Sequence, residues 1–407
     1  MSFLAANARW LVAGFLLTFF SSFGQTFFIS IWSAEIRAEF GLTHGGFGGI
    51  YMLATLGSAI CLPFVGRLID ATTVRLFALG VVTTLAAFTL LMAFSPNVVL
   101  LVAAIFGLRL FGQGLMTHTA MTAMGRWFIA ARGKAVALAT IGLQAGEALL
   151  PSVFVALATA LTWRQTWLVA AALIALVALP AILWLTRLER EPQGDEAQAE
   201  MRGRQWTRAE VLRDPLFWAL ALGVMLPPFT GTSIFFHQDY LIALNGWEPA
   251  VYYAAFAVMA ATTTVFALLT GLAVDRVGAI RLLPIFFVPL GMACMTLGLF
   301  SAEWAAIAFM FLLGVSYGIS STLFGALWPE AYGTRHLGAV RSVIVALMVF
   351  FTAAGPGLTG LLIDLGVPFP RQLLFIGAYC FAIAGVMVWA SRRLRARRAI
   401  ELGTRPA

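Results

Sequence analysis

Two ionisable residues, Arg109 and Glu147, lie deep inside long apolar stretches of this 407-residue chain. Measured as helix rise, Arg109 lies about 25 Å from Arg126, and Glu147 lies about 20 Å from Lys134. A charge at the middle of a bilayer costs about 3 kcal/mol or more, so each residue must pair or face water. The sequence supports two interpretations: a proton or substrate site in a central cavity, or a structural ion pair between them.

Other polar residues could line the same site. Gln113 lies one helical turn after Arg109, and Gln144 lies one turn before Glu147, so each shares a helix face with its neighbour. The remaining candidates are polar residues within apolar stretches: Gln25, Thr26, Thr230, Tyr317 and Ser321. We expect a substrate and proton site among these nine residues, although each polar residue alone is also compatible with a helix–helix hydrogen bond. No spacing of Cys, His, Asp or Glu predicts a metal site or a cofactor.

Three further polar residues stand apart from this set. His237 and Asp239 lie near the end of an apolar stretch, where they could form a pH-sensing gate or could simply be wetted interface residues. His118 lies on the opposite side of its helix from Arg109 and is interpreted as structural.

The elements that position these residues follow from composition. Hydrophobic residues make up 61% of the chain and charged residues 11%, against about 25% charged in soluble domains. The hydrophobic residues form continuous stretches of about 20, the length of a membrane-spanning helix, and they do not alternate as barrel strands would. The fold class is an all-α polytopic membrane protein with twelve transmembrane helices. The predicted spans are roughly 10–33, 46–66, 74–95, 97–123, 134–160, 165–186, 215–240, 250–272, 279–300, 303–328, 338–362 and 371–391.

A tandem repeat divides these spans into two bundles. Gly66 and Asp70 recur as Gly271 and Asp275, each 205 positions later. The same offset relates Gly133 and Pro151 to Gly338 and Pro356. We therefore predict two six-helix parallel-repeat bundles. The predicted domains are an N-terminal bundle (1–186), a cytoplasmic linker (187–214), a C-terminal bundle (215–393) and a basic cytoplasmic tail (394–407).

Basic residues predict the orientation. If both termini are cytoplasmic, 22 of the 26 Lys and Arg residues lie on the cytoplasmic side, Arg109 lies within a span, and only Arg37, Arg164 and Arg371 face outside. The net charge of +8 then reflects membrane topology, and no nucleic-acid partner is predicted. We expect a monomeric multi-pass protein of a bacterial-type inner (plasma) membrane, with lipids, protons and a small molecule as its partners.

Two short polar segments resemble a known motif. Gly66-Arg-Leu-Ile-Asp70 and Gly271-Leu-Ala-Val-Asp-Arg-Val-Gly278 are similar to the cytoplasmic loop motif of the major facilitator superfamily, G-x-x-x-D-R-x-G-R. Arg109-Leu-Phe-Gly-Gln-Gly114 resembles the fourth-helix motif of that superfamily. The resemblance implies a conformational latch formed by Gly66, Asp70, Arg75, Gly271, Asp275, Arg276 and Gly278.

A narrower resemblance concerns the substrate. Arg126-Trp-Phe, Arg132-Gly-Lys-Ala and Gly142 to Pro151 look like the fourth-to-fifth helix region of the monocarboxylate and oxalate–formate carriers. The resemblance implies a small organic anion. The cationic residue that those carriers usually place in their eighth or eleventh span has no mid-span counterpart in Tyr252–Leu272 or Gly338–Leu362.

We therefore expect a secondary transporter that works by alternating access and is coupled to protons through Glu147. No phosphate-binding loop is present, so ATP drive is not expected, and no arrangement of a nucleophile and a base predicts an enzyme. Two alternatives remain open: a proton-driven exporter of drug-like compounds, and a transport-dead sensor or lipid-handling protein on the same fold.

Overall fold

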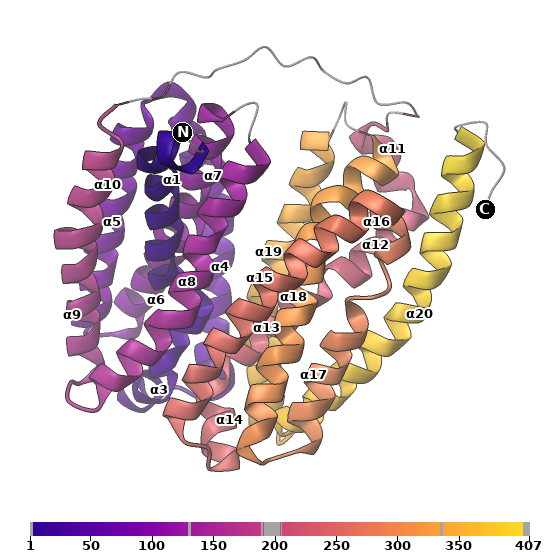
Figure 1. Cartoon of the computed structure of the whole chain (residues 1–407). Helices are drawn as coiled ribbons and strands as arrows, with labels where there is room; N and C mark the ends of the chain where they lie inside the picture. Colours follow the sequence, from indigo (N-terminus) through magenta and orange to yellow (C-terminus); the bar gives the residue numbers. More distant parts are fainter. Residues whose placement is uncertain are drawn as a thin grey trace. The chain divides into compact units, whose positions relative to one another are not determined.

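The structure is a computed structural model that describes residues 3–128, 132–188, 190, 204, 206–333 and 337–401. Within these residues, twelve helical spans are long and apolar enough to cross a membrane (Figure 1). The spans are Leu4–Gly24, His44–Ile69, Val74–Phe94, Val98–Trp127, Ala135–Ala158, Trp163–Leu185, Pro215–Phe236, Pro249–Val274, Ala279–Leu299, Glu303–Tyr332, Val343–Asp364 and Phe369–Ile400. The predicted fold class of twelve transmembrane helices is confirmed.

The elements of the first half of the chain are α1 (Phe3–Phe20), η1 (Ser21–Gly24), α2 (Thr26–Ile29), η2 (Ser30–Trp32), α3 (Ser33–Phe40), α4 (His44–Gly66), η3 (Arg67–Ala71), α5 (Val74–Phe94), α6 (Val98–Gly107), η4 (Leu108–Met116), α7 (Thr117–Trp127), α8 (Arg132–Ala158), α9 (Trp163–Leu173), η5 (Ile174–Ala178) and α10 (Leu179–Leu185). Those of the second half are α11 (Arg208–Arg213), α12 (Pro215–Val224), α13 (Leu226–Phe236), α14 (Gln238–Asn245), α15 (Pro249–Val277), α16 (Ala279–Leu282), α17 (Phe287–Leu299), α18 (Glu303–Tyr332), α19 (Leu337–Asp364) and α20 (Phe369–Glu401).

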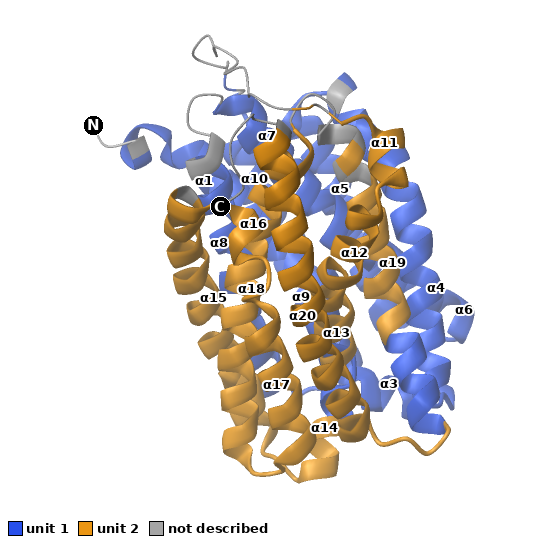
Figure 2. Ribbon diagram, turned by 90° about the vertical axis from the view of Figure 1, so that its right-hand side faces the viewer, with its two compact units in different colours: residues 1–197, 235–240, 356–364 blue, residues 198–234, 241–355, 365–407 orange. Residues whose placement is uncertain are grey.

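The helices group into two compact units, blue and orange in Figure 2. Unit 1 comprises residues 1–197 together with 235–240 and 356–364. Unit 2 comprises residues 198–234, 241–355 and 365–407. The end of α13, the start of α14 and the end of α19 therefore belong to unit 1, although the rest of each helix lies in unit 2.

Corresponding helices pack together in the two units, as a tandem repeat requires. In unit 1, α5 of the third span contacts α6 of the fourth span and α9 of the sixth. In unit 2, α17 of the ninth span contacts α18 of the tenth span and α20 of the twelfth. The second span likewise contacts the fourth in unit 1, and the eighth contacts the tenth in unit 2. Because helices in a membrane associate by close packing, glycines recur at these contacts, as Gly314 and Gly318 do between α18 and α15.

The first span differs from its prediction. The sequence predicts one apolar helix over roughly 10–33, but the structure ends this helix at Gly24 and continues it as the short elements α2 and η2. Gln25 has extended backbone angles, φ −83° and ψ 154°, which an α-helix cannot accommodate. The break frees the Gly24 carbonyl from the backbone ladder of its own helix, and a side chain from another helix bonds to it.

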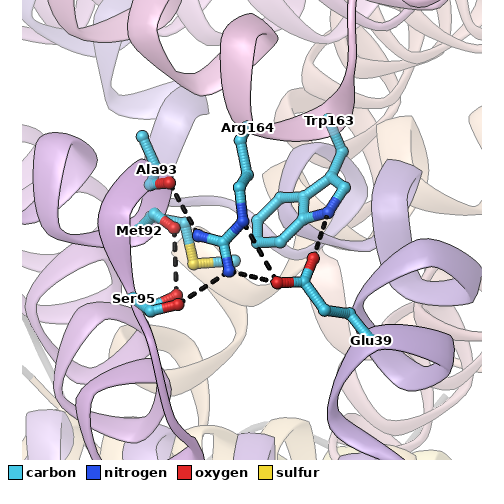
Figure 3. A network of polar contacts seen from close by, with 6 residues as sticks. All are labelled: Glu39, Met92, Ala93, Ser95, Trp163 and Arg164. Atoms are coloured by element: carbon cyan, nitrogen blue, oxygen red, sulfur yellow. Dashed lines mark hydrogen bonds and ion pairs between the residues drawn. The ribbon is translucent and has the colours of Figure 1, made fainter.

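A polar cluster joins three helices at the end of unit 1 where α3 lies (Figure 3). Arg164, at the start of α9, donates from Nη2 to Glu39 Oε1 of α3 at 2.5 Å. The same guanidinium donates to the carbonyls of Ala93 and Ser95 at the end of α5, each at 2.7 Å. Trp163 Nε1 donates to Glu39 Oε2 at 2.9 Å. Arg164 thus satisfies carbonyls that the end of α5 leaves free.

Arg164→Ala should lower the melting temperature of the purified protein by about 2–4 °C, because two carbonyls and Glu39 lose a charged donor. The bond from Arg164 lowers the pKa of Glu39 below its usual 4.5. The contribution of the Arg164–Glu39 bond to stability is therefore present above about pH 4.5, and it is lost as the pH falls through the lowered pKa of Glu39. The difference in melting temperature between Arg164→Ala and the wild type should become smaller at acidic pH. Arg208→Ala, which removes an exposed arginine on α11, is the control and should leave the melting temperature unchanged.

Candidate functional site

Arg109 lies in a π-helical segment, η4, in the middle of the fourth span. Such segments shift the helix faces and occur often at functional sites. The Arg109 side chain is 2% exposed. Its Nη1 donates to the Gly24 carbonyl at 3.2 Å and to Thr26 Oγ1 at 3.3 Å. Arg109 Nε has no hydrogen-bond partner among the described residues.

The break in the first span supplies the acceptor for Arg109. Because the helix stops at Gly24, the Gly24 carbonyl is free to receive the guanidinium, and it lies at the negative end of the dipole of that helix. Gly24 is also required by packing. A Cβ on Gly24 would lie 2.1 Å from the Leu108 carbonyl oxygen and 2.7 Å from the Gly112 Cα. The first and fourth spans therefore touch backbone to backbone at this point.

Tyr51 of α4 completes the cluster and was not predicted from the sequence. Its hydroxyl lies 2.6 Å from Thr26 Oγ1, and its ring centroid lies 5.3 Å from the Arg109 Cζ. The face of the ring attracts a guanidinium. The sequence did carry one signal for Tyr51: a tyrosine within an apolar span has a buried hydroxyl, and a buried hydroxyl needs a hydrogen-bond partner. We call Arg109, Gly24, Thr26 and Tyr51 the Arg109 cluster.

Glu147 lies on α8 of the fifth span and is 8% exposed. Among the residues that the structure describes, no ion pair joins Glu147 to Arg109. The reason is the position of η1, which packs on both helices. On one side Gly24 contacts η4, and on the other a Cβ on Gly146 would lie 2.2 Å from Ser22 Oγ. The structural ion pair, one of the two interpretations of the sequence, required the fourth and fifth spans to lie side by side at this level, and the first span lies there instead.

The remaining candidates of unit 1 lie around η1. Gln25 forms the break itself and is partly buried. The backbone nitrogen of Gln113 would lie 2.6 Å from a Cβ on Gly24. Gln144 Oε1 is buried and has no partner among the described residues. Thr26 belongs to the Arg109 cluster, so Gln25, Thr26 and Gln113 all lie at the same segment of the first span.

The candidates of unit 2 lie on α13 and α18. A Cβ on Gly231 would lie 1.5 Å from the Tyr317 hydroxyl, so Tyr317 contacts the α13 backbone next to Thr230. Thr230 is fully buried, and its hydroxyl has no partner in the described part of the chain. Ser321 is exposed and donates to the Gly318 carbonyl at 3.1 Å. Thr230 and Tyr317 thus lie close together, whereas Ser321 does not share their surroundings.

The side chains of the two latch aspartates, Asp70 and Asp275, lie outside the described residues. Arg75 and Arg276 are exposed. Gly66 is buried and borders His118, whose Nε2 would lie 3.3 Å from a Cβ on Gly66. His118 therefore packs at the first latch segment.

The second latch segment has a partner that was not predicted from the sequence. Gly278 has φ +84°, a conformation that favours glycine, and it ends α15. Glu330 Oε2 accepts from the Ala279 backbone nitrogen at 2.6 Å, and Glu330 Oε1 accepts from Arg398 at 2.7 Å. The start of a helix favours a nearby carboxylate, and this preference was the signal from which a partner such as Glu330 could have been predicted. Gly271 is partly buried and loosely packed, since a Cβ on Gly271 would lie 3.9 Å from its nearest neighbour, Thr322 Cγ2.

No group of three His, Cys, Asp or Glu residues that could hold a metal ion occurs in the part of the chain that the structure describes. The described site consists of a buried guanidinium with neutral acceptors and a buried carboxyl group with no cation beside it among the described residues.

Comparisons with known proteins point to one family. Residues 14–344 match a family described as the Major Facilitator Superfamily. An "Uncharacterized MFS-type transporter YcxA" of Bacillus subtilis (strain 168) is 27% identical over 355 residues, which are 83% of this chain and 82% of that protein.

Two solved structures share the fold. Both are of a bacterial homolog to the human lysosomal transporter Spinster. The unoccupied inward-facing structure has a TM-score of 0.67 at 16% identity and covers 98% of this chain and 95% of its own. The occupied inward-facing structure has a TM-score of 0.65 at 18% identity, with 97% and 94% covered.

Proposed function

Because this chain belongs to the Major Facilitator Superfamily, whose members carry out secondary transport of solutes across membranes, we propose that it moves a small organic anion together with protons. Glu147 is the proposed proton-binding residue and Arg109 the proposed source of anion selectivity. Transport occurs by alternating access, with no cofactor. The protein acts as a monomer in a bacterial-type inner membrane, with both termini in the cytoplasm, as the distribution of basic residues favours.

The observation that carries the proposal is the burial of Glu147 without a counter-ion. Its carboxyl group is 8% exposed within the fifth span, and the described residues place no Arg or Lys within ion-pair distance. An ionised carboxylate in such a place is costly, and binding a proton removes that cost. A side chain that is neutral when buried and ionised when wetted can carry a proton between the two states of a transporter.

The Arg109 cluster favours an anionic substrate. Arg109 is buried against neutral acceptors, so the interior of unit 1 carries a positive charge that no described carboxylate cancels. A positive interior attracts an anion and repels a cationic, drug-like compound. Movement of one monoanion with one proton is also electrically neutral, so the membrane potential would not oppose it.

Reconstituted vesicles test the proposal. Radiolabelled formate, lactate, oxalate and succinate are offered one at a time to vesicles with an alkaline interior, and protein-free vesicles correct for passive entry. We expect at least one acid to accumulate, with acidification of an internal pH dye, and accumulation to stop when nigericin removes the gradient. Gradient-driven movement of tetraphenylphosphonium instead would favour a drug exporter, and absence of all flux would favour a transport-dead protein.

A further inference from the structure

His237 lies at the break between α13 and α14, in the segment 235–240 of unit 1. The sequence allowed two interpretations of His237: a wetted interface residue or part of a pH-sensing gate. The structure makes the first interpretation wrong, because His237 is 1% exposed. A fully buried histidine must have both ring nitrogens satisfied, and it must be neutral unless a charge partner accompanies it.

Two groups of the segment 356–364 satisfy the ring. His237 Nε2 lies 3.0 Å from Thr359 Oγ1. The Pro356 carbonyl accepts a hydrogen bond from the other side of the ring. The Thr359 hydroxyl also lies 3.5 Å from the Pro356 carbonyl, to which it donates, and its role toward His237 Nε2 depends on the tautomer of the ring. A protonated ring presents two N–H donors, which the Thr359 hydroxyl and the Pro356 carbonyl can accept, so the cost of the charge comes from the burial of the ring.

Charged and titratable groups of α3, α4 and α14 lie around His237. From α3, Arg37 pairs with Asp239 of α14 at 2.9 Å. From α4, the His44 ring lies 5.9 Å from the His237 ring and 5.1 Å from the Tyr240 ring. The nearest carboxylate, Asp239, is already engaged by Arg37, and so it offers limited compensation to a charged His237.

The fourth group, Asp364 of α19, is engaged as well. Its Oδ2 accepts from the Gly45 backbone nitrogen at 2.8 Å. Glycines hold α4 and the end of α19 at backbone distance: a Cβ on Gly48 would lie 2.4 Å from the Pro356 carbonyl oxygen, and one on Gly360 would lie 2.6 Å from the His44 carbonyl oxygen. The end of α19 thus packs backbone to backbone on α4, and His237 is buried where these segments meet.

We infer that His237 is a proton-binding site, separate from Glu147, whose protonation releases the packing of residues 235–240 and 356–364 on α3 and α4. The buried ring favours the neutral form, whereas a ring exposed to water accepts a proton readily. Proton binding and separation of these segments therefore assist one another, by the reciprocity of linked equilibria.

The size of the effect follows from the pKa. Burial, followed by the charges of His44 and Arg37, lowers the pKa of His237 from 6.5 to about 4, and Asp239 opposes this only in part. Because the pKa of His237 is lower in the packed arrangement than in the separated one, the packed arrangement keeps its full stability at neutral pH. It loses stability as the pH falls below about 6.5. Between pH 7.5 and pH 5.0 the packed arrangement should lose about 30-fold in its equilibrium against the separated one.

A titration of the wild-type protein is the first test. The chain has four histidines, so selective 15N-histidine labelling gives few signals, and His237→Gln assigns the one of interest. We expect the His237 signal to titrate well below pH 6.5. Titration at the usual value, near 6.5, would overturn the inference without any need for a folded variant.

Accessibility of Ser30 is the second test. Ser30 is fully buried: its hydroxyl donates to the Phe235 carbonyl and accepts from Gln238 Nε2, so separation of residues 235–240 exposes it. Ser30→Cys is introduced into full-length protein whose Cys61, Cys294 and Cys380 are replaced by alanine. Its reaction with a methanethiosulfonate reagent is measured at pH 7.5 and 5.0, relative to a free thiol at the same pH.

With His237 present, the relative rate should rise about 30-fold at pH 5.0. With His237→Gln, whose amide keeps the size and polarity but takes up no proton, the rate should be the same at both pH values. His118→Gln, at the other end of unit 1, is the matched control and should keep the full rise. An equal rise in His237→Gln, or a flat response with His237 present, would contradict the inference.

Discussion

Glu147→Gln is expected to abolish accumulation of the transported anion driven by a pH gradient, while exchange of labelled for unlabelled anion continues. Glutamine keeps the size and hydrogen-bonding capacity of a protonated glutamic acid but cannot release a proton. The carboxyl group is buried in α8 without a described cation, so the substitution leaves no charge unpaired. The variant should therefore fold and bind but lose coupling.

The measurement compares the two activities in the same vesicles. Accumulation against a gradient should fall to the level of protein-free vesicles, and exchange should stay within about twofold of the wild type, since binding is retained. Glu248→Gln is the matched control, because Glu248 is exposed and makes no side-chain cap at the start of α15. Normal accumulation in Glu147→Gln would move proton coupling to another residue. Loss of exchange as well would mean that Glu147 contacts the substrate.

Gly24→Ala is expected to cause a large loss of stability. The added Cβ would lie 2.1 Å from the Leu108 carbonyl oxygen, 2.6 Å from the Gln113 nitrogen and 2.7 Å from the Gly112 Cα. All three are backbone atoms, so no side chain can turn away, and the first and fourth spans must separate. Overpacking of this kind costs about 3 kcal/mol or more.

Separation of the two spans should also disturb the Arg109 cluster, because the Gly24 carbonyl receives the Arg109 guanidinium. The melting temperature and the monodisperse fraction of purified Gly24→Ala should both fall. Gly80→Ala is the control: Gly80 is exposed on α5 and nothing lies within 4 Å of its Cβ position. That variant should be as stable as the wild type or slightly more stable, since alanine favours helix over glycine. A Gly24→Ala protein that melts like Gly80→Ala would contradict a backbone contact at Gly24.

Much of the molecule follows from the sequence by itself. Continuous apolar stretches must become helices, because a bilayer offers the backbone no hydrogen-bond partners. The twelve spans were therefore predictable, as were the repeat that relates Gly66 to Gly271 and the membership of a transporter superfamily. The position of Arg109 and Glu147 inside the fourth and fifth spans was equally predictable, since position along a helix is a matter of counting residues.

The partners of those side chains were decided by the tertiary structure. The sequence allowed Arg109 and Glu147 to pair, but η1 lies between their helices, and Arg109 donates to Gly24 and Thr26 instead. Nothing in the local sequence specifies which helix occupies the space between two others. The break at Gln25 was hidden for the same reason: no proline adjoins it, and the free carbonyl it creates is stabilised by an arginine 85 positions away.

His237 shows the same limit at the end of a span. Its place in the sequence, near the end of the predicted span 215–240, is typical of a wetted interface residue. Its burial depends on Thr359 and Pro356, more than a hundred positions later, which pack on it through the close contact of α4 with the end of α19. The length of an apolar stretch indicates where a span ends. The exposure of a residue near that end depends on which segments far along the chain pack against it.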